Sequence, residues 1–379
     1  MIPVNEPLLN GNEKKYLNEC IDSGWISSEG PFVKRFEQQM STAVSRRHGI
    51  AVCNGTAALE LAVAALGLEP GDEIVMPTFT IISCASAIVR YGCVPMLVDS
   101  NPLTWNMDVE QLKEKLKSEI ELKGNKRIKA IMVVHIYGLP VDMDPLLELA
   151  QQYGLKIIED AAEMHGQTYR GRPCGSFGDI STFSFYPNKH ITTGEGGMAL
   201  TDDDRLAQRC RSLRDLCFQT QKRFVHEELG YNFRMTNMQA ALGVAQLERL
   251  GEFVARKRRM GLRYTELLNG TEGLELMPEK TDYAENIYWV FGMVLKDGVP
   301  FDAKEAMRRL GEQGIATRPF FWSMHEQPVL QKMGLFHGET YPVAERLARR
   351  GFYIPSGMAL TEGQMETVVV AIKEMMLNL

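Results

Sequence analysis

Short, continuous apolar segments alternate with helical patterns through the first two-thirds of the chain, and this order restricts the fold more than any other feature. Because the expected strands are apolar throughout rather than at every second position, helices should cover both faces of the sheet, as is typical of parallel sheets. The sequence therefore predicts an α/β fold with a mostly parallel central sheet. The expected strands are residues 73–76, 94–99, 130–135, 156–160, 180–185 and 198–201, and the expected helices are residues 57–66, 83–91, 109–116 and 143–153.

The pattern changes in the last third of the chain. A single helical spacing runs from residue 237 to residue 268, where an Asn-Gly pair ends it. We therefore expect a large domain (residues 1–245) and a smaller C-terminal α+β domain (residues 246–379), joined by this long helix. Within the smaller domain we expect a strand at residues 288–295 and helices at residues 303–313 and 365–376.

Composition and charge exclude several classes of protein. The chain carries 42 Lys and Arg against 48 Asp and Glu, a net charge of −6, which makes nucleic acid an unfavourable partner. No apolar run approaches the ~18 residues of a membrane span, and the first residues carry no basic and apolar export signal. The seven cysteines form no C-x-x-C pair and the seven histidines are scattered singly. The sequence thus predicts a cytoplasmic protein with reduced thiols and without a metal site.

A small-residue turn follows the short apolar strand at residues 51–52. Residues 54–59 read Asn-Gly-Thr-Ala-Ala-Leu, so an alanine-rich helix begins directly after the turn. The free N–H groups and the positive dipole at such a helix start bind phosphate well, and Thr56 adds a hydroxyl. The alternative is an ordinary helix that Thr56 caps.

Two acids, Glu159 and Asp160, close a buried strand. A carboxylate is costly to bury unless it is paired, and the C-terminal end of a parallel strand is where α/β sheets bind ligands. Asp160 therefore suits the protonated ring nitrogen of a cofactor. A helix cap after the strand is the alternative.

Lys189 follows an apolar strand and precedes a glycine-rich turn. A partly desolvated lysine at this place has a lowered pKa and suits Schiff-base chemistry, although most lysines are simply solvated. The turn also contains Gly194-x-Gly196-x-x-Ala199, a minimal dinucleotide fingerprint that would indicate a nicotinamide oxidoreductase. An expected strand rather than a helix follows this fingerprint, which argues against that interpretation.

These three features together are more specific than any one of them. A phosphate site, a strand-end Asp and a later strand-end Lys are the three anchors that pyridoxal phosphate requires. The chain resembles the DegT-type nucleotide-sugar aminotransferases, of the fold-type I pyridoxal-phosphate class, and the resemblance extends from residues 2–4 and 24–28 to residues 318–321. It implies that Lys189 forms the imine with the cofactor and that Asp160 pairs with the pyridine nitrogen. It also implies that Gly55, Thr56 and Ser184 contact the phosphate and that Glu163 lies close to the ring.

The resemblance also implies a homodimer with active sites at the subunit interface. Residues 230–237 match the family segment in which the asparagine, here Asn232, reaches the cofactor phosphate of the neighbouring subunit. One departure concerns the residue that stacks on the pyridine ring. Family members commonly have an aromatic residue there, whereas this chain has Ile81.

The implied reaction transfers an amino group from L-glutamate to a nucleotide-linked 4-keto-6-deoxy sugar, with pyridoxamine phosphate as the intermediate cofactor form. Residues 185–197 and 318–321 most resemble members that act on GDP-4-keto-6-deoxymannose, although Pro187 and His190 depart from their Gly-Asn-Lys-Thr run. UDP- or dTDP-linked sugars are alternatives. A sugar 3-dehydratase, in which His replaces the lysine, is opposed by Lys189, and His190 is expected to be structural. The residues expected at the substrate are Trp25, Arg318 and His325.

Overall fold

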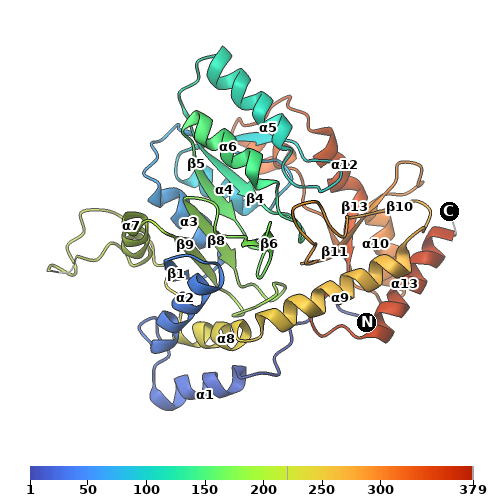
Figure 1. The fold of residues 1–379 in the computed structure, drawn as a ribbon, viewed down its shortest axis with the longest axis horizontal. Helices are drawn as coiled ribbons and strands as arrows, with labels where there is room; N and C mark the ends of the chain where they lie inside the picture. Colours follow the sequence, from blue (N-terminus) through green and yellow to red (C-terminus); the bar gives the residue numbers. More distant parts are fainter. Residues whose placement is uncertain (220, 378–379) are drawn as a thin grey trace.

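A seven-stranded sheet forms the centre of the molecule (Figure 1). The computed structural model describes residues 1–219 and 221–377. Strand β9 runs antiparallel to both of its neighbours, and each neighbouring pair from β8 to β3 is parallel, so the predicted mostly parallel sheet is confirmed. The order across the sheet is β1 (His48–Val52), β9 (Gly197–Thr201), β8 (Ile180–Ser184), β5 (Lys156–Asp160), β4 (Ile128–Val134), β2 (Glu73–Pro77) and β3 (Val94–Val98).

Helices cover both faces of this sheet, as the continuous apolar strands predicted. Successive strand residues enter different cores: Ile74 packs on one face and Val75 on the other. One face is covered by α3 (Gly55–Ala65), α4 (Ile82–Arg90) and α7 (Asp204–Arg214). The other face is covered by α1 (Glu13–Ser23), α2 (Pro31–Ala43), α5 (Val109–Leu116), α6 (Met143–Tyr153) and α8 (Asn237–Leu247).

The single helix expected over residues 237–268 is wrong, because the structure has two helices there. Helix α8 ends before Glu248, and α9 (Leu250–Leu268) begins after Arg249, whose backbone leaves helical geometry at φ −113°. The Glu248 carboxylate accepts hydrogen bonds from Asn12 Nδ2 at 2.8 Å and Tyr16 Oη at 2.7 Å. The break between α8 and α9 thus lies where the chain contacts the distant N-terminal segment. The helical spacing of apolar residues gives no information about such contacts.

A second, antiparallel sheet lies beyond α9 (Figure 1). Its order is β10 (Leu274–Leu276), β11 (Phe291–Leu295), β13 (Gly351–Ile354) and β12 (Arg318–Pro319), packed with α9, α10 (Ala303–Glu312) and α13 (Glu362–Leu377). The first residues of the chain join this part, since Ile2 pairs with Ile315 and the Val4 carbonyl accepts from Ser356 N–H. The domain boundary at residue 245 stays a prediction. The remaining elements are η1 (Lys117–Leu122), β6 (Thr168–Tyr169), β7 (Arg172–Pro173), η2 (Met324–Glu326), α11 (Pro328–Lys332) and α12 (Pro342–Arg350).

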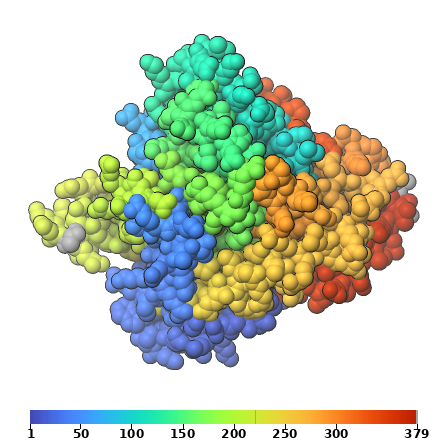
Figure 2. Space-filling view, viewed as in Figure 1, coloured from blue at the N-terminus to red at the C-terminus, as the bar shows by residue number. Residues whose placement is uncertain are grey.

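One segment projects from the body of the molecule. Figure 2 shows the yellow-green region that contains residues 221–230 standing out from the rest. Within it Phe224 is 81% and Leu229 90% exposed.

All seven cysteines are free thiols. Within the described ranges, every helix is too short or too polar to cross a membrane.

Candidate active site

A cavity of about 720 Å³ opens where the parallel strands end. The segments that directly follow β1, β2, β4, β5 and β8 all contribute to its lining, because parallel strands bring their carboxyl ends to one edge of the sheet. Of the residues expected at the cofactor, all but Asn232 lie here. They are Gly55, Thr56, Ile81, Asp160, Glu163, Ser184 and Lys189.

One end of the cavity is the start of α3. The Asn54 side chain caps this helix by accepting from Ala57 N–H at 2.8 Å, so the alternative in which Thr56 is the cap is wrong. The Thr56 hydroxyl instead lies 2.9 Å from the Ser83 hydroxyl. A Cβ on Gly55 would come within 2.8 Å of the Ser184 Cβ, so glycine lets these segments meet. Hydroxyls and N–H groups thus converge where a phosphate would be favoured.

The Asp160 carboxylate lies deeper in the cavity and is 3% exposed. It accepts a hydrogen bond from Ala162 N–H at 3.1 Å and a weak one from the Cys84 thiol at 3.4 Å. Burial raises the pKa of Asp160, and these two bonds together with the charge of Lys189 oppose that rise. In the described part of the chain Asp160 has no cation within salt-bridge distance. A cationic ligand would therefore stabilise its ionised form.

Glu163 and Lys189 face each other across the cavity. Lys189 Nζ lies 3.8 Å from Glu163 Oε1, and their side chains are 10% and 8% exposed. Burial lowers the pKa of Lys189 and raises that of Glu163 to about 8, while the mutual attraction of the pair opposes both shifts. Glu163 Oε2 also accepts from Tyr137 N–H at 2.7 Å. The Lys189 amine is therefore largely shielded from water and lies close to the Glu163 carboxyl group. Schiff-base chemistry requires such a partly desolvated amine.

The second sheet completes the cavity with aromatic side chains. Trp289 precedes β11, Phe321 follows β12, and Tyr353 lies in β13. The Tyr137 ring stacks on Phe321 at 5.3 Å and on Trp289 at 5.7 Å between ring centroids. Sequence reasoning included residues 318–321 in the family resemblance but missed Trp289 and Tyr353. A lone aromatic in an apolar strand carries no local signal for a cavity.

Four of the expected cofactor and substrate residues lie outside the cavity lining, and three of them are exposed. Asn232 is exposed and pairs with Asp215. Trp25 is 49% exposed, and its carbonyl accepts from Asn237 Nδ2 at 2.7 Å. Arg318 is exposed on β12, opposite Tyr353. The roles of these three residues stay predictions.

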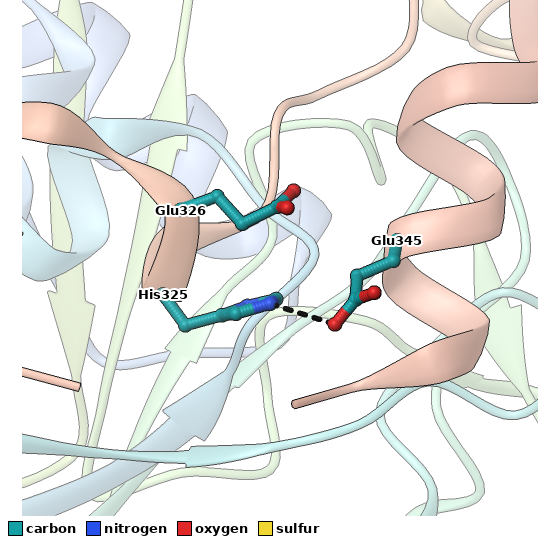
Figure 3. Close-up of side chains that lie close together, drawn as sticks. All are labelled: His325, Glu326 and Glu345. Atoms are coloured by element: carbon teal, nitrogen blue, oxygen red, sulfur yellow. Dashed lines mark hydrogen bonds and ion pairs between the residues drawn. The ribbon is translucent and has the colours of Figure 1, made fainter. Parts of the chain in front are cut away.

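His325 also lies outside the cavity, at 3% exposure (Figure 3). Its Nδ1 lies 3.0 Å from Thr78 Oγ1 and its Nε2 3.0 Å from Glu345 Oε1. Glu326 is next to it, so one imidazole and two carboxylates come within 4.8 Å of one another, a grouping that singly scattered histidines did not suggest. Arg349, however, already binds the Glu326 carboxylate. This pairing makes the cluster a packing contact between η2 and α12.

The other histidine of interest, His190, is buried away from the lining. Its Nε2 lies 3.2 Å from the Ile287 carbonyl oxygen, and burial lowers its pKa well below the usual value. Its neighbour Lys189 faces the cavity. The two side chains therefore have separate environments.

Known proteins resemble this chain over its whole length. The model of the DegT/DnrJ/EryC1/StrS aminotransferase family matches residues 7–373. GDP-perosamine synthase of Escherichia coli O157:H7 is 40% identical over 373 residues, which is 98% of each chain.

Solved structures agree with these matches. The aminotransferase TlmJ from Streptoalloteichus hindustanus has a TM-score of 0.90 at 30% identity and covers 99% of this chain and 98% of its own. DesV of S. venezuelae, in complex with a ketimine intermediate, has a TM-score of 0.86 at 30% identity over 96% of this chain and 94% of its own. The expected fold class is thereby confirmed.

Proposed function

This chain belongs to the DegT/DnrJ/EryC1/StrS aminotransferase family, and we propose that it transfers an amino group from L-glutamate to C4 of GDP-4-keto-6-deoxymannose, which yields GDP-perosamine. The observation that carries the amino transfer is the placement of Lys189 and Asp160 in one cavity beside the start of α3. The choice of sugar is supported by the relative named GDP-perosamine synthase, which this chain matches from end to end.

The residues of the cavity fit pyridoxal phosphate as the proposed cofactor. Gly55, Thr56 and Ser184 form a cradle that a Cβ on Gly55 would fill. Asp160 is a buried carboxylate without a described cation in salt-bridge distance, which suits a protonated ring nitrogen. When bound, this cofactor supplies an electron sink for the carbanion formed at the substrate carbon.

Each residue then has a definite task. The N–H groups at the start of α3 and the hydroxyls of Thr56 and Ser184 hold the phosphate. Asp160 keeps the ring nitrogen protonated. Lys189 Nζ accepts the proton that leaves Cα of glutamate and, in the second half of the reaction, delivers one to C4 of the sugar. The aromatic wall of Trp289, Phe321 and Tyr353 excludes water from this exchange.

The proposed assembly is a homodimer in which Asn232 reaches the cofactor phosphate of the neighbouring subunit. The exposed Phe224 and Leu229 support this assembly, because a projecting segment with large apolar side chains favours burial against another surface. Light scattering after gel filtration tests it. The expected mass is that of two chains, and the mass of one chain would contradict the assembly.

A substrate panel tests the proposed reaction. The purified enzyme, loaded with pyridoxal phosphate, is given glutamate and a GDP-, UDP- or dTDP-linked 4-keto-6-deoxy sugar, and the 2-oxoglutarate and amino sugar formed are measured. The GDP sugar should give the highest kcat/KM. Preference for a UDP or dTDP sugar would overturn the substrate. A dehydrated sugar without amino transfer would overturn the reaction.

A further inference from the structure

The amine of Lys189 has a second neighbour besides Glu163. Its Nζ lies 3.8 Å from the centroid of the Trp289 ring, on the ring face. The amine is thus placed between a carboxyl group and an indole face, and the carboxyl oxygen is also 3.8 Å away. Both partners favour an ammonium over a neutral amine: Glu163 does so by its charge when it is ionised, and Trp289 does so by the quadrupole of its ring.

The fold holds the Trp289 ring firmly in this place. Its Nε1–H donates to the Asn188 carbonyl at 2.9 Å, so the ring is fixed to the residue next to Lys189. Its backbone carbonyl accepts from Lys257 Nζ at 2.7 Å, and that ammonium also donates to the Ser356 carbonyl. Lys257 is 2% exposed, and its location on α9 anchors the start of β11 to this helix. The ring orientation is therefore set by the backbone on two sides.

Glu163 is fixed as well. Its carboxylate accepts from the N–H of Tyr137, a non-glycine residue with φ +57°. That left-handed backbone is unfavourable for tyrosine. The Tyr137 ring, which packs among the other aromatic side chains, holds this backbone conformation, and its hydroxyl accepts from Phe321 N–H at 3.2 Å. Tyr137 thus links the carboxyl group beside the amine to the aromatic wall.

Amino transfer requires Lys189 to alternate between a form joined to the cofactor and a free amine. The free amine must stay near the reacting carbon to move its proton, yet leave room for the substrate. We propose that Glu163 and Trp289 together form the resting position of the Lys189 amine whenever it is not joined to the cofactor. This inference rests on the proposed function. It makes Trp289, which lies 100 positions after Lys189 in the sequence, a positioning residue.

The test measures the pKa of Lys189 in cofactor-free protein. The rate at which each lysine reacts with acetic anhydride is followed against pH by peptide mass spectrometry. Trp289→Leu should lower the Lys189 pKa by about one unit, as expected for a desolvated cation–π contact. Trp289→Phe, which keeps a weaker ring, should give a smaller decrease. Glu163→Gln should also lower it, because the variant lacks the charge that stabilises the ammonium.

A control removes an indole–cation contact at the surface of the molecule, where Trp322 is 44% exposed. Trp322 lies against Arg349 at 5.2 Å, so Trp322→Leu removes an indole–cation contact elsewhere and should leave the Lys189 pKa unchanged. Slow labelling of the buried Lys257 in every variant reports an intact fold.

An unchanged Lys189 pKa in either Trp289→Leu or Glu163→Gln would overturn the resting position. Failure of the proposed function gives a different result. In that case the wild-type protein would not transfer amino groups, whereas the pKa shifts of the cofactor-free variants would persist.

Discussion

Two acids that are neighbours on β5, Glu159 and Asp160, have opposite surroundings. Glu159 accepts from Phe177 N–H at 2.8 Å and Gly178 N–H at 3.2 Å, and it pairs with His135 at 3.2 Å. These bonds lower its pKa although burial opposes them. Burial raises the pKa of Asp160, and its few bonds do not reverse that shift. Both carboxylates are almost completely buried, so exposure does not distinguish them.

The difference indicates a structural role for Glu159 and is consistent with the role at the cofactor that we propose for Asp160. Successive residues of a strand point to opposite faces of the sheet. Glu159 meets the loop around Gly175–Gly178, which saturates its oxygens, whereas Asp160 meets the cavity. A buried carboxylate that the protein leaves poorly paired is free to stabilise a ligand, and a saturated one stabilises the fold.

The largest expected effect is on the structural acid. Glu159→Gln removes the charge that His135 and the N–H groups of Gly175, Phe177 and Gly178 stabilise. Breaking such a buried pair costs about 3–5 kcal/mol. The free energy of unfolding from urea titrations should fall by that amount. The kcat of the protein that remains folded should stay near that of the wild type. A variant as stable as the wild type would contradict the structural role.

Asp160→Asn should show the reverse pattern. The substitution preserves shape and removes a poorly paired charge, so the free energy of unfolding of the cofactor-free protein should not decrease. Transamination should slow by about 10²–10³-fold, the range for loss of one electrostatic stabiliser at a reacting group. Turnover comparable to that of the wild type would remove Asp160 from the proposed mechanism.

The pH dependence of stability sharpens the comparison further. The pKa of Glu163 is raised from 4.5 to about 8, so the folded protein binds more protons than the unfolded chain between these values. As the pH rises from 4.5 to about 8, the free energy of unfolding of the wild type should therefore fall relative to that of Glu163→Gln. The lowered pKa of Glu159 gives the opposite sign: its contribution is present above 4.5 and lost as pH falls further. Urea unfolding of cofactor-free proteins between pH 4.5 and about 8 measures the Glu163 slope, and unfolding below pH 4.5, relative to Glu159→Gln, measures the Glu159 slope. Slopes of the same sign would contradict the distinction.

The smallest expected effect concerns Ile81, which lines the cavity and is 45% exposed. Ile81→Tyr restores the aromatic residue that is usual in the family. The dissociation constant of pyridoxal phosphate should fall by about 2- to 12-fold, as expected for ring stacking. Ile82→Tyr, at the next position and outside the lining, is the matched control. Equal effects of the two substitutions would show that stacking is not the cause.

Local sequence signals predicted the parts of the site that one strand end or one helix start determines. The turn before α3 and Lys189 each follow a short apolar strand, and Asp160 ends one. Parallel pairing brings such strand ends together. The alternating order of strands and helices likewise predicted the central sheet. Family resemblance, rather than spacing, pointed to Glu163 and Ser184.

The remaining features depend on contacts between distant segments. Trp289 and Tyr353 reach the cavity from the second sheet, and Lys257 is buried because carbonyl groups of other segments surround its ammonium. The interruption between α8 and α9 depends on Glu248 and the N-terminal segment. The family resemblance led us to expect His325 at the substrate, whereas in the structure it lies outside the cavity lining, next to Thr78 and Glu345.

Covalent trapping of the cofactor tests whether Lys189 is the residue that joins pyridoxal phosphate. The protein is incubated with pyridoxal phosphate, reduced with borohydride, digested and mapped by mass spectrometry. The account predicts a yellow protein whose colour borohydride bleaches, with the reduced cofactor attached to the peptide that contains Lys189. A colourless protein, or attachment to another buried lysine such as Lys257, would contradict it.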